Sequence, residues 1–203
     1  MAGSGAAPRD LIREQNMRII AGERRGRKLL SPEGTEVRPT TNMVKESVFN
    51  ILQFGIEGRR FLDLFAGSGQ MGLEALSRGA REAVFVDSSR ESLRVIEKNI
   101  ASAGFGDRAK VAASDFAGFL KAGRDSFDVA FIDPPYREGL MERALELTAL
   151  RMSPGGVILC EHGSREELPE RAGEFFKAKV YKYGKTSVTA YRAGEKQQRS
   201  GET

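Results

Sequence analysis

Asp63-Leu-Phe-Ala-Gly-Ser-Gly-Gln-Met-Gly72 is the stretch that decides the fold, because an apolar run ends in an acid and a glycine-rich turn follows. Residues 61–65 have the composition of a buried strand, and helical spacing begins after the turn. The three glycines of the turn fit the pattern G-x-G-x-x-G, in which a ligand approaches backbone N–H groups at a helix start. The stretch predicts an α/β fold with a nucleoside-containing cofactor. By itself it does not distinguish a dinucleotide from S-adenosylmethionine.

Apolar runs alternate with helical segments on the C-terminal side of this turn. Continuous apolar strands that alternate with helices predict a parallel sheet covered on both faces. The end of the chain differs, because two β-type runs flank the dipeptide Gly184-Lys185 and predict an antiparallel hairpin. The expected architecture is a seven-stranded, mostly parallel sheet closed by this hairpin. Its strands are expected at residues 61–65, 83–86, 110–112, 127–132, 156–160, 175–183 and 186–191.

The N-terminal part is short, basic and differently patterned. Two short strands are expected at residues 18–21 and 27–30, and helical spacing follows Pro39 as far as Gly55. This pattern predicts a small extension made of a β-hairpin and a helix. The predicted organisation is a flexible leader (1–16), a basic extension (17–57), the α/β domain (58–193) and a flexible tail (194–203).

Composition limits the chemistry that the chain can perform. Its 203 residues include one cysteine, Cys160, and one histidine, His162, so an internal disulfide and Cys- or His-rich metal sites are excluded. We expect no metal and leave both residues outside the site. No apolar run approaches the roughly 18 residues of a membrane span, and no signal-peptide pattern is present. A cytoplasmic protein is expected, and the net charge of +4 argues only weakly for a nucleic-acid partner.

Acids at the ends of predicted strands indicate the kind of cofactor. Asp87 ends the second strand, where a carboxylate can accept both ribose hydroxyls of an adenosine, although it can also be a plain strand-end acid. Asp63 precedes the glycines, where its carboxylate would repel a pyrophosphate and bind the ammonium of a methionine group. The alternative for Asp63 is a structural carboxylate that caps the helix or braces the loop. Asp115 can accept from an adenine amine or cap the next helix, and Phe116 can pack on the adenine ring. The predicted cofactor contacts are Thr40, Asp63, Phe65, Ala66, Gly67, Ser68, Gly69, Asp87, Ser88, Asp115 and Phe116.

Phe131-Ile-Asp-Pro-Pro-Tyr136 ends the fourth predicted strand in an acid, two prolines and an aromatic residue. Prolines stiffen the loop because they fix φ and donate no N–H. The Asp133 carboxylate and the Pro134 carbonyl could then accept from an exocyclic amine of a base, while Tyr136 stacks on the ring. The alternative is a purely structural proline turn in which the Asp caps the turn. The predicted catalytic residues are Asp133, Pro134, Pro135 and Tyr136.

The residues 63–69 together with 133–136 resemble class I S-adenosylmethionine-dependent methyltransferases that act on an exocyclic amine. More narrowly, four segments are similar to the bacterial 16S rRNA guanine-N2 methyltransferase family of the RsmD type. They are Met17-Arg-Ile-Ile-Ala-Gly22, Arg25-Gly-Arg-Lys-Leu29, Arg38-Pro-Thr-Thr41 with Lys45-Glu46 and Phe49-Asn50, and Gly72-Leu-Glu-Ala-Leu-Ser-Arg-Gly79. The similarity extends over residues 17–192. It implies a Rossmann-like class I fold, S-adenosylmethionine as cofactor and one guanine N2 in 16S rRNA as the methylated atom. It also implies the assembled small ribosomal subunit as substrate and an Arg38-Pro-Thr segment that folds over the cofactor.

Basic residues then become candidates for contacts with RNA phosphates, with a solvated charged surface as the alternative. They are Arg24, Arg25, Arg27, Lys28, Arg38, Lys182 and Lys185. A structured RNA must present its guanine flipped or already splayed. The chain is expected to act as a monomer.

Three other functions compete with this interpretation. An adenine-N6 methyltransferase of DNA would use the same acid and prolines, but no separate target-recognition domain is evident. An NAD-dependent oxidoreductase would account for the glycines and leave the Asp-Pro-Pro-Tyr loop unexplained. A non-catalytic RNA-binding assembly factor would not need to retain the cofactor acids together with this loop.

Overall fold

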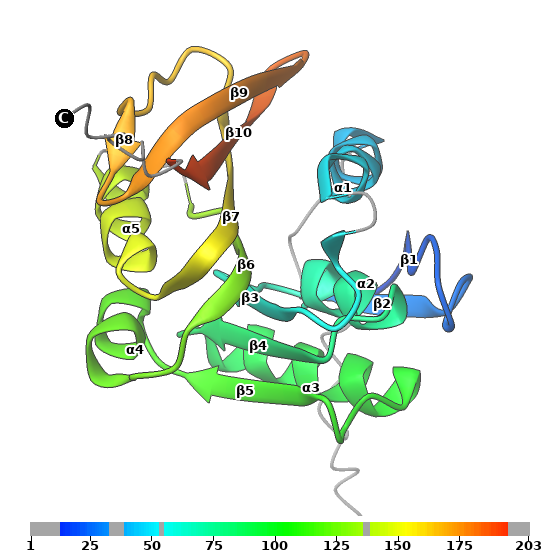
Figure 1. Cartoon of the computed structure of the whole chain (residues 1–203). Coiled ribbons are helices and arrows are strands. Elements are labelled where there is room, and N and C mark those ends of the chain that lie inside the picture. The colour runs from blue at the N-terminus through cyan, green and yellow to red at the C-terminus, as the bar shows by residue number, and fades with distance from the viewer. Residues whose placement is uncertain (1–12, 33–38, 53–54, 136–138, 195–203) are drawn as a thin grey trace, which may run out of the picture.

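The computed structural model describes residues 13–32, 39–52, 55–135 and 139–194 (Figure 1). Most of the described chain forms an eight-stranded sheet with the strand order β5-β4-β3-β6-β7-β10-β9-β8. The strands are β3 (Arg60–Leu64), β4 (Glu82–Asp87), β5 (Ala109–Ala113), β6 (Phe127–Ile132), β7 (Met152–Gly163), β8 (Arg171–Ala172), β9 (Phe175–Tyr183) and β10 (Thr186–Ala193). Helix α1 (Pro39–Leu52) precedes the sheet in the chain. One helix then follows each of β3, β4, β5 and β6, namely α2 (Gln70–Ser77), α3 (Arg90–Ala103), α4 (Phe116–Ala122) and α5 (Leu140–Ala149).

The sheet confirms the predicted change from parallel to antiparallel pairing. β5, β4, β3, β6 and β7 pair in parallel, whereas β10 pairs antiparallel with both β7 and β9. Gly184 adopts a positive φ of 64° in the turn between β9 and β10, as a two-residue hairpin turn requires. The additional eighth strand is β8, two residues long, which pairs with the start of β9.

The two faces of the sheet have separate cores, since neighbouring residues of a strand point in opposite directions. Phe61 packs on the side of α1, α2 and α3, and Leu62 packs on the side of α4 and α5. Figure 1 shows these two groups of helices on opposite sides of the twisted sheet. The inner strands β3, β4 and β6 are therefore covered on both faces, which explains their continuous apolar runs, whereas the edge strand β5 has no buried residue.

The N-terminal hairpin consists of β1 (Arg13–Arg18) and β2 (Lys28–Ser31), which pair antiparallel. β1 includes residues 13–16, which the sequence assigns to the leader, so the predicted boundary after residue 16 is wrong. The physical reason is the pairing with β2, in which Arg13 lies opposite Ser31 and Glu14 lies opposite Leu30. Residues 1–12 lie outside the described part of the chain.

Buried polar side chains fix this hairpin to the α/β domain. The carboxylate of Glu74 on α2 accepts from the N–H groups of Ile20 (2.7 Å) and Ala21 (3.0 Å). Asn99 on α3 accepts from the N–H of Leu30 and donates to the carbonyl oxygens of Leu30 and Ser68. Because Met17, Ile19 and Leu29 also join the core on the α1 side, the extension forms one wall of the site described next.

Candidate functional site

A cavity of about 280 Å³ lies at the carboxyl ends of β3 and β6, beside β7 and beneath α1. Ligands of open α/β sheets bind at this edge, where the strands end and the loops begin. Six predicted site residues line it, namely Asp63, Phe65, Ala66, Gly67, Ser68 and Asp133. The structure therefore brings the glycine turn and the Asp-Pro-Pro loop together in one cavity.

The glycine turn has the backbone of a close-approach loop. Phe65 has a φ of 67°, a left-handed conformation that is uncommon for a residue with a side chain, and Gly67 follows with a φ of 57°. A Cβ built on Gly67 would meet no atom within 4 Å, so the absent side chain leaves open space above the turn. Gly72 serves packing instead, because a Cβ there would lie 2.3 Å from the Phe85 ring.

Asp63 is buried at the end of β3, with 2% of its surface exposed. Its Oδ2 accepts from the N–H of Gly72 at 2.9 Å, so the predicted alternative of a loop-bracing carboxylate is present in the structure. Burial raises the pKa of Asp63 to about 8, and the nearby charges of Asp133 and Asp87 act in the same direction. No ion pair reaches Asp63 within the described residues, so the cavity contains a carboxyl group that would be stabilised by a cation.

Asp87 links the end of β4 to the glycine turn. Its Oδ2 accepts from the N–H of Gly67 (2.9 Å) and its Oδ1 from the N–H of Ser89 (2.8 Å). Asp87 and the exposed Ser88 are not in the cavity wall, so the ribose contact stays a prediction.

Asp115 caps α4, because its Oδ1 accepts from the N–H groups of Ala117 (3.1 Å) and Gly118 (2.9 Å). The capping alternative for this residue is therefore confirmed. The Phe116 ring lies 5.2 Å from the Phe65 ring, centroid to centroid, which places it beside the glycine turn. Contacts of Asp115 and Phe116 with an adenine stay predictions.

Asp133 follows β6 directly and opens into the cavity. The protein atoms around its carboxyl group raise its pKa well above the ordinary value through desolvation. Pro134 is buried and Pro135 is exposed. Tyr136 and Arg38 lie outside the described residues, and Thr40 lies in α1 with its side chain outside the described part.

Two ionisable residues of the cavity were not among the predicted site residues. Lys45 of α1 is completely buried, and its Nζ donates to the carbonyl oxygen of Arg18 at 2.7 Å. Burial lowers the pKa of Lys45 to about 8, against the opposite effect of Glu74. Glu161 of β7 is half-buried, and both desolvation and the charge of Asp133 raise its pKa.

Polar atoms without partners also mark this cavity. The hydroxyl of the fully buried Ser31 and the Oε1 of Gln70 have no hydrogen-bond partner, and both side chains line the cavity. Buried polar groups are normally satisfied, so unpaired ones at a cavity wall indicate that a polar ligand completes them.

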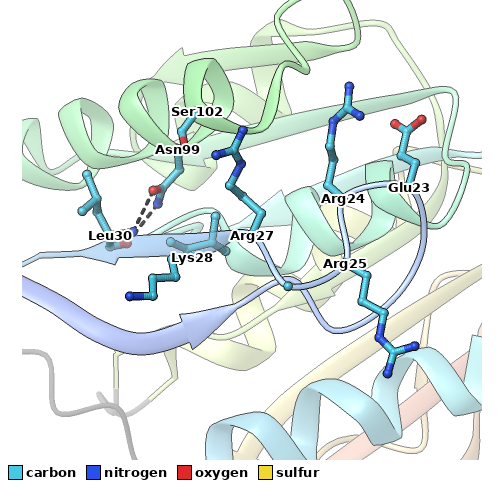
Figure 2. A pocket seen from close by; sticks show the side chains of 10 residues that line it. Glu23, Arg24, Arg25, Arg27, Lys28, Leu30, Asn99 and Ser102 are labelled. Atoms are coloured by element: carbon cyan, nitrogen blue, oxygen red, sulfur yellow. Dashed lines mark hydrogen bonds between the residues drawn. The ribbon is translucent and has the colours of Figure 1, made fainter.

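Four of the seven predicted RNA contacts lie in or next to the loop between β1 and β2. Figure 2 shows Arg24, Arg25, Arg27 and Lys28 around a hollow of about 630 Å³ that Asn99 and Ser102 of α3 also line. Arg24 is anchored, because its Nε donates to the carbonyl oxygen of Ala103 at 2.7 Å, while Arg25, Arg27 and Lys28 are exposed. Lys182 and Lys185 are exposed on the hairpin of β9 and β10, and neither lines this hollow.

Comparison with known proteins identifies the family. The family model described as Conserved hypothetical protein 95 matches residues 17–192. The ribosomal RNA small subunit methyltransferase D of Haemophilus influenzae is 41% identical over 152 residues, which cover 71% of this chain and 78% of its own. This chain belongs to the RsmD family. YlbH of Bacillus subtilis is 38% identical over 181 residues, covering 87% of this chain and 98% of its own length.

Solved structures agree with this RsmD family assignment. The structure of yhhF from Escherichia coli has a TM-score of 0.79 and 35% identity, and the match covers 87% of this chain and 97% of that one. A Thermus thermophilus 16S rRNA N2 G1207 methyltransferase, solved with AdoMet and guanosine, has a TM-score of 0.73 at 24% identity, over 91% of this chain and 51% of that one. At that identity the likeness shows the class I methyltransferase fold alone.

The remaining candidates in this RsmD family member have structural roles or none. His162 is buried, and its ring nitrogens contact the Oγ1 of Thr189 (2.7 Å) and the carbonyl oxygen of Gly163 (3.0 Å). Cys160 is buried in the core on the α4 and α5 side. Over the described ranges, no group of three or more His, Cys, Asp or Glu residues could hold a metal ion. None of the described helices is long and apolar enough to cross a membrane.

Proposed function

We propose that this chain transfers a methyl group from S-adenosylmethionine to the exocyclic N2 amine of a guanine in 16S rRNA. The observation that carries the proposal is the cavity in which two buried ionisable groups without an ion pair among the described residues, Asp63 and Lys45, lie beside the Asp133-Pro134-Pro135 loop. RsmD family membership and the class I methyltransferase fold support the reaction type and the RNA substrate.

The residues of the cavity suit the amino-acid end of S-adenosylmethionine. This end is a zwitterion, and an isolated buried charge is strongly unfavourable unless it is paired. In our proposal Asp63 faces the ammonium and Lys45 faces the carboxylate, while Gln70 and Ser31 use their unpaired oxygens for further hydrogen bonds. Asp87, which braces Gly67, would hold the ribose hydroxyls.

When bound, S-adenosylmethionine supplies a methyl group attached to a sulfonium sulfur, and the sulfur is a good leaving group because it departs as a neutral thioether without needing an acid. The work left to the protein is orientation of the amine. The Asp133 carboxylate accepts one amine hydrogen and the Pro134 carbonyl accepts the other, so the nitrogen lone pair turns out of conjugation toward the methyl carbon. The methylated nitrogen would have one proton to release, and the Asp133 carboxylate would be the adjacent acceptor for it. Positioning of this kind can supply a large part of a rate enhancement.

The exposed basic loop supports the RNA part of the proposal. Arg25, Arg27 and Lys28 are free to contact phosphates, and the hairpin that carries them forms the wall of the methyl-transfer cavity through Met17 and Ser31. The loop itself packs on Ser77 and Ala103, at the ends of α2 and α3 that lie away from the glycine turn, so a substrate held by it would have to extend along the hairpin to reach the cavity. We propose 16S rRNA within the small ribosomal subunit as the partner.

Methyl transfer from labelled S-adenosylmethionine tests the proposal. Purified protein is offered small ribosomal subunits, naked small-subunit rRNA and duplex DNA, and the products are digested and identified as nucleosides by mass spectrometry. We expect N2-methylguanosine in small-subunit rRNA and none in DNA. Formation of N6-methyladenine in the duplex would support the DNA adenine alternative. Binding of the subunit without any transfer of label would support the assembly-factor alternative.

A further inference from the structure

Glu161 lies beside Asp133 at the edge of the sheet. β6 and β7 pair in parallel with Ile132 opposite Cys160, so the residues that follow these two stand next to each other across the ladder. Both side chains line the cavity of about 280 Å³. Leu159, two residues before Glu161, packs in the core on the α1 side, so the alternation of β7 directs Glu161 to the same face.

The two carboxyl groups form a pair of neighbouring acceptors without a cation. Within the described residues no Lys or Arg forms an ion pair with Asp133 or Glu161, although such pairs occur elsewhere in the sheet. Desolvation and the charge of Asp133 raise the pKa of Glu161, and the N–H donors of a bound base would favour the ionised, accepting form of the carboxyl group. The hydroxyl of the fully buried Ser31 in the same wall has no hydrogen-bond partner and is available to a polar ligand.

Two adjacent acceptors fit a base that presents an exocyclic amine next to a ring N–H, and guanine is the base with this arrangement. The exocyclic amine of adenine stands beside the ring nitrogen N1, and that of cytosine beside N3, and both ring nitrogens are acceptors. In guanine the N2 amine stands beside the N1–H, which is a donor. A carboxylate next to the amine-binding group therefore completes a hydrogen bond with guanine and faces a lone pair in adenine or cytosine.

We propose that Glu161 accepts the N1–H of the target guanine and thereby selects guanine over adenine. The inference rests on the proposed function, in which Asp133 binds the N2 amine. In this proposal Glu161 faces the substrate base from the side of the cavity that holds Asp133. A site that hydrogen-bonds a substrate N–H strongly rejects an analogue without that N–H, because the acceptor of the site is then left without a partner. An apolar pocket discriminates between similar substrates much more weakly.

The test replaces the target guanine of the methylated RNA by 2-aminopurine, which keeps the amine at C2 but has no hydrogen on N1. For the wild type we expect kcat/KM to be about 100-fold or more higher with guanine than with 2-aminopurine. In Glu161→Gln the side-chain amide can donate to the bare N1, so the ratio should fall below about 10-fold. Affinity for S-adenosylmethionine, measured by calorimetry, should stay unchanged. Glu174→Gln, which alters an exposed carboxylate of the β8–β9 turn, is the matched control and should keep the wild-type ratio.

Glu161→Asp keeps the carboxylate with one methylene less, so it should retain the preference for guanine at a lower rate and serves if Glu161→Gln does not fold. An unchanged ratio in folded Glu161→Gln, with normal activity on guanine, would overturn the role of Glu161 and leave the proposed function intact. An equal fall of the ratio of guanine to 2-aminopurine activity in the control Glu174→Gln would also overturn the role of Glu161. Failure of the wild type to methylate guanine N2 at all would overturn the proposed function together with this inference.

Discussion

The charged side chains at the two ends of the parallel strands differ in whether they form ion pairs. At the amino ends Arg60 forms ion pairs with Glu82 and with Asp125 (2.8 Å), and Lys110 pairs with Glu82 at 2.6 Å. At the carboxyl ends Asp63, Asp133, Glu161 and Lys45 share one cavity, and none of them has an ion pair among the residues that the structure describes. Both ends belong to the same sheet, so the contrast supports the proposal that the groups without ion pairs at the carboxyl ends bind a ligand.

The largest expected effect comes from Asp133→Ala at the carboxyl end. Removal of the carboxylate that orients the amine should lower kcat by about 10²–10³, as loss of a preorganised polar group at a reacting centre does elsewhere. The Kd for S-adenosylmethionine, measured by calorimetry, should change less than about threefold, because the cofactor lies against other residues of the cavity. Asp128→Ala is the control at the amino end, where Asp128 accepts from the N–H of Arg60 at 2.9 Å. It should lower the Tm and leave kcat near the wild-type value. An equal loss of cofactor binding in Asp133→Ala would contradict its assigned role.

The next effect concerns the buried cation. Lys45→Met should weaken binding of S-adenosylmethionine about 10- to 100-fold, the equivalent of one charge-assisted hydrogen bond. Binding of 5′-methylthioadenosine, which has no carboxylate, should be unchanged, and calorimetry with both ligands separates the two cases. Lys110→Met removes a lysine paired at the amino end and should leave both affinities unchanged. Equal weakening of both ligands by Lys45→Met would show a general distortion of the cavity.

A smaller effect should appear in the pH profile. Desolvation raises the pKa of Asp133 above its ordinary value, and the ionised carboxylate is the form that accepts from the amine. The protonated fraction grows as the pH falls through the raised pKa, so kcat/KM should fall on the acid side with a limiting slope of about tenfold per pH unit and level off on the alkaline side. Rates measured from pH 5.5 to pH 9 on saturating cofactor test this. A profile that is flat down to pH 5.5 would mean that Asp133 is already ionised there.

The smallest effect is a gain in stability. Asp63 has a folded-state pKa of about 8 against an ordinary value of 3.8, so the folded protein binds the proton more tightly than the unfolded chain does. The wild type therefore loses stability as the pH rises from about 4 to about 8. Asp63→Asn keeps an oxygen for the N–H of Gly72 and cannot ionise.

For Asp63→Asn the Tm of the ligand-free protein should exceed that of the wild type by about 2–6 °C at pH 8, and the difference should vanish near pH 4. Differential scanning calorimetry of both proteins at several pH values measures it. The same variant should bind S-adenosylmethionine more weakly, because it lacks the charge that faces the ammonium. A Tm difference that does not depend on pH would contradict the raised pKa.

The fold was largely predictable because its signals are local. The apolar runs that became β3, β4 and β6 are continuous, and the turn at Gly184-Lys185 specified the antiparallel end. The start of β1 was missed because residues 13–16 are polar, and only their pairing with β2 makes them a strand. Such pairing is a tertiary contact that a single sequence does not display.

The candidate site was predictable where an acid follows a strand, as with Asp63 and Asp133. Glu161 lies within a strand, and only its position beside Asp133 in the neighbouring strand indicates a role. Lys45 stands next to Val44 in an amphipathic helix, where a lysine normally reaches solvent, and the packing of α1 on the hairpin buries it. For Asp115 the local signal pointed equally to a cap and to a ligand contact, and the structure has the cap.

In our proposal the groups without ion pairs at the carboxyl ends serve methylation of guanine N2 in small-subunit rRNA. Mass spectrometry of small-subunit rRNA tests it most directly, in cells that lack this chain and in the same cells complemented with the wild type or with Asp133→Ala. We predict that one N2-methylguanosine disappears on deletion, returns with the wild type and stays absent with Asp133→Ala. An unchanged content of N2-methylguanosine after deletion, or its full return with Asp133→Ala, would contradict the claim.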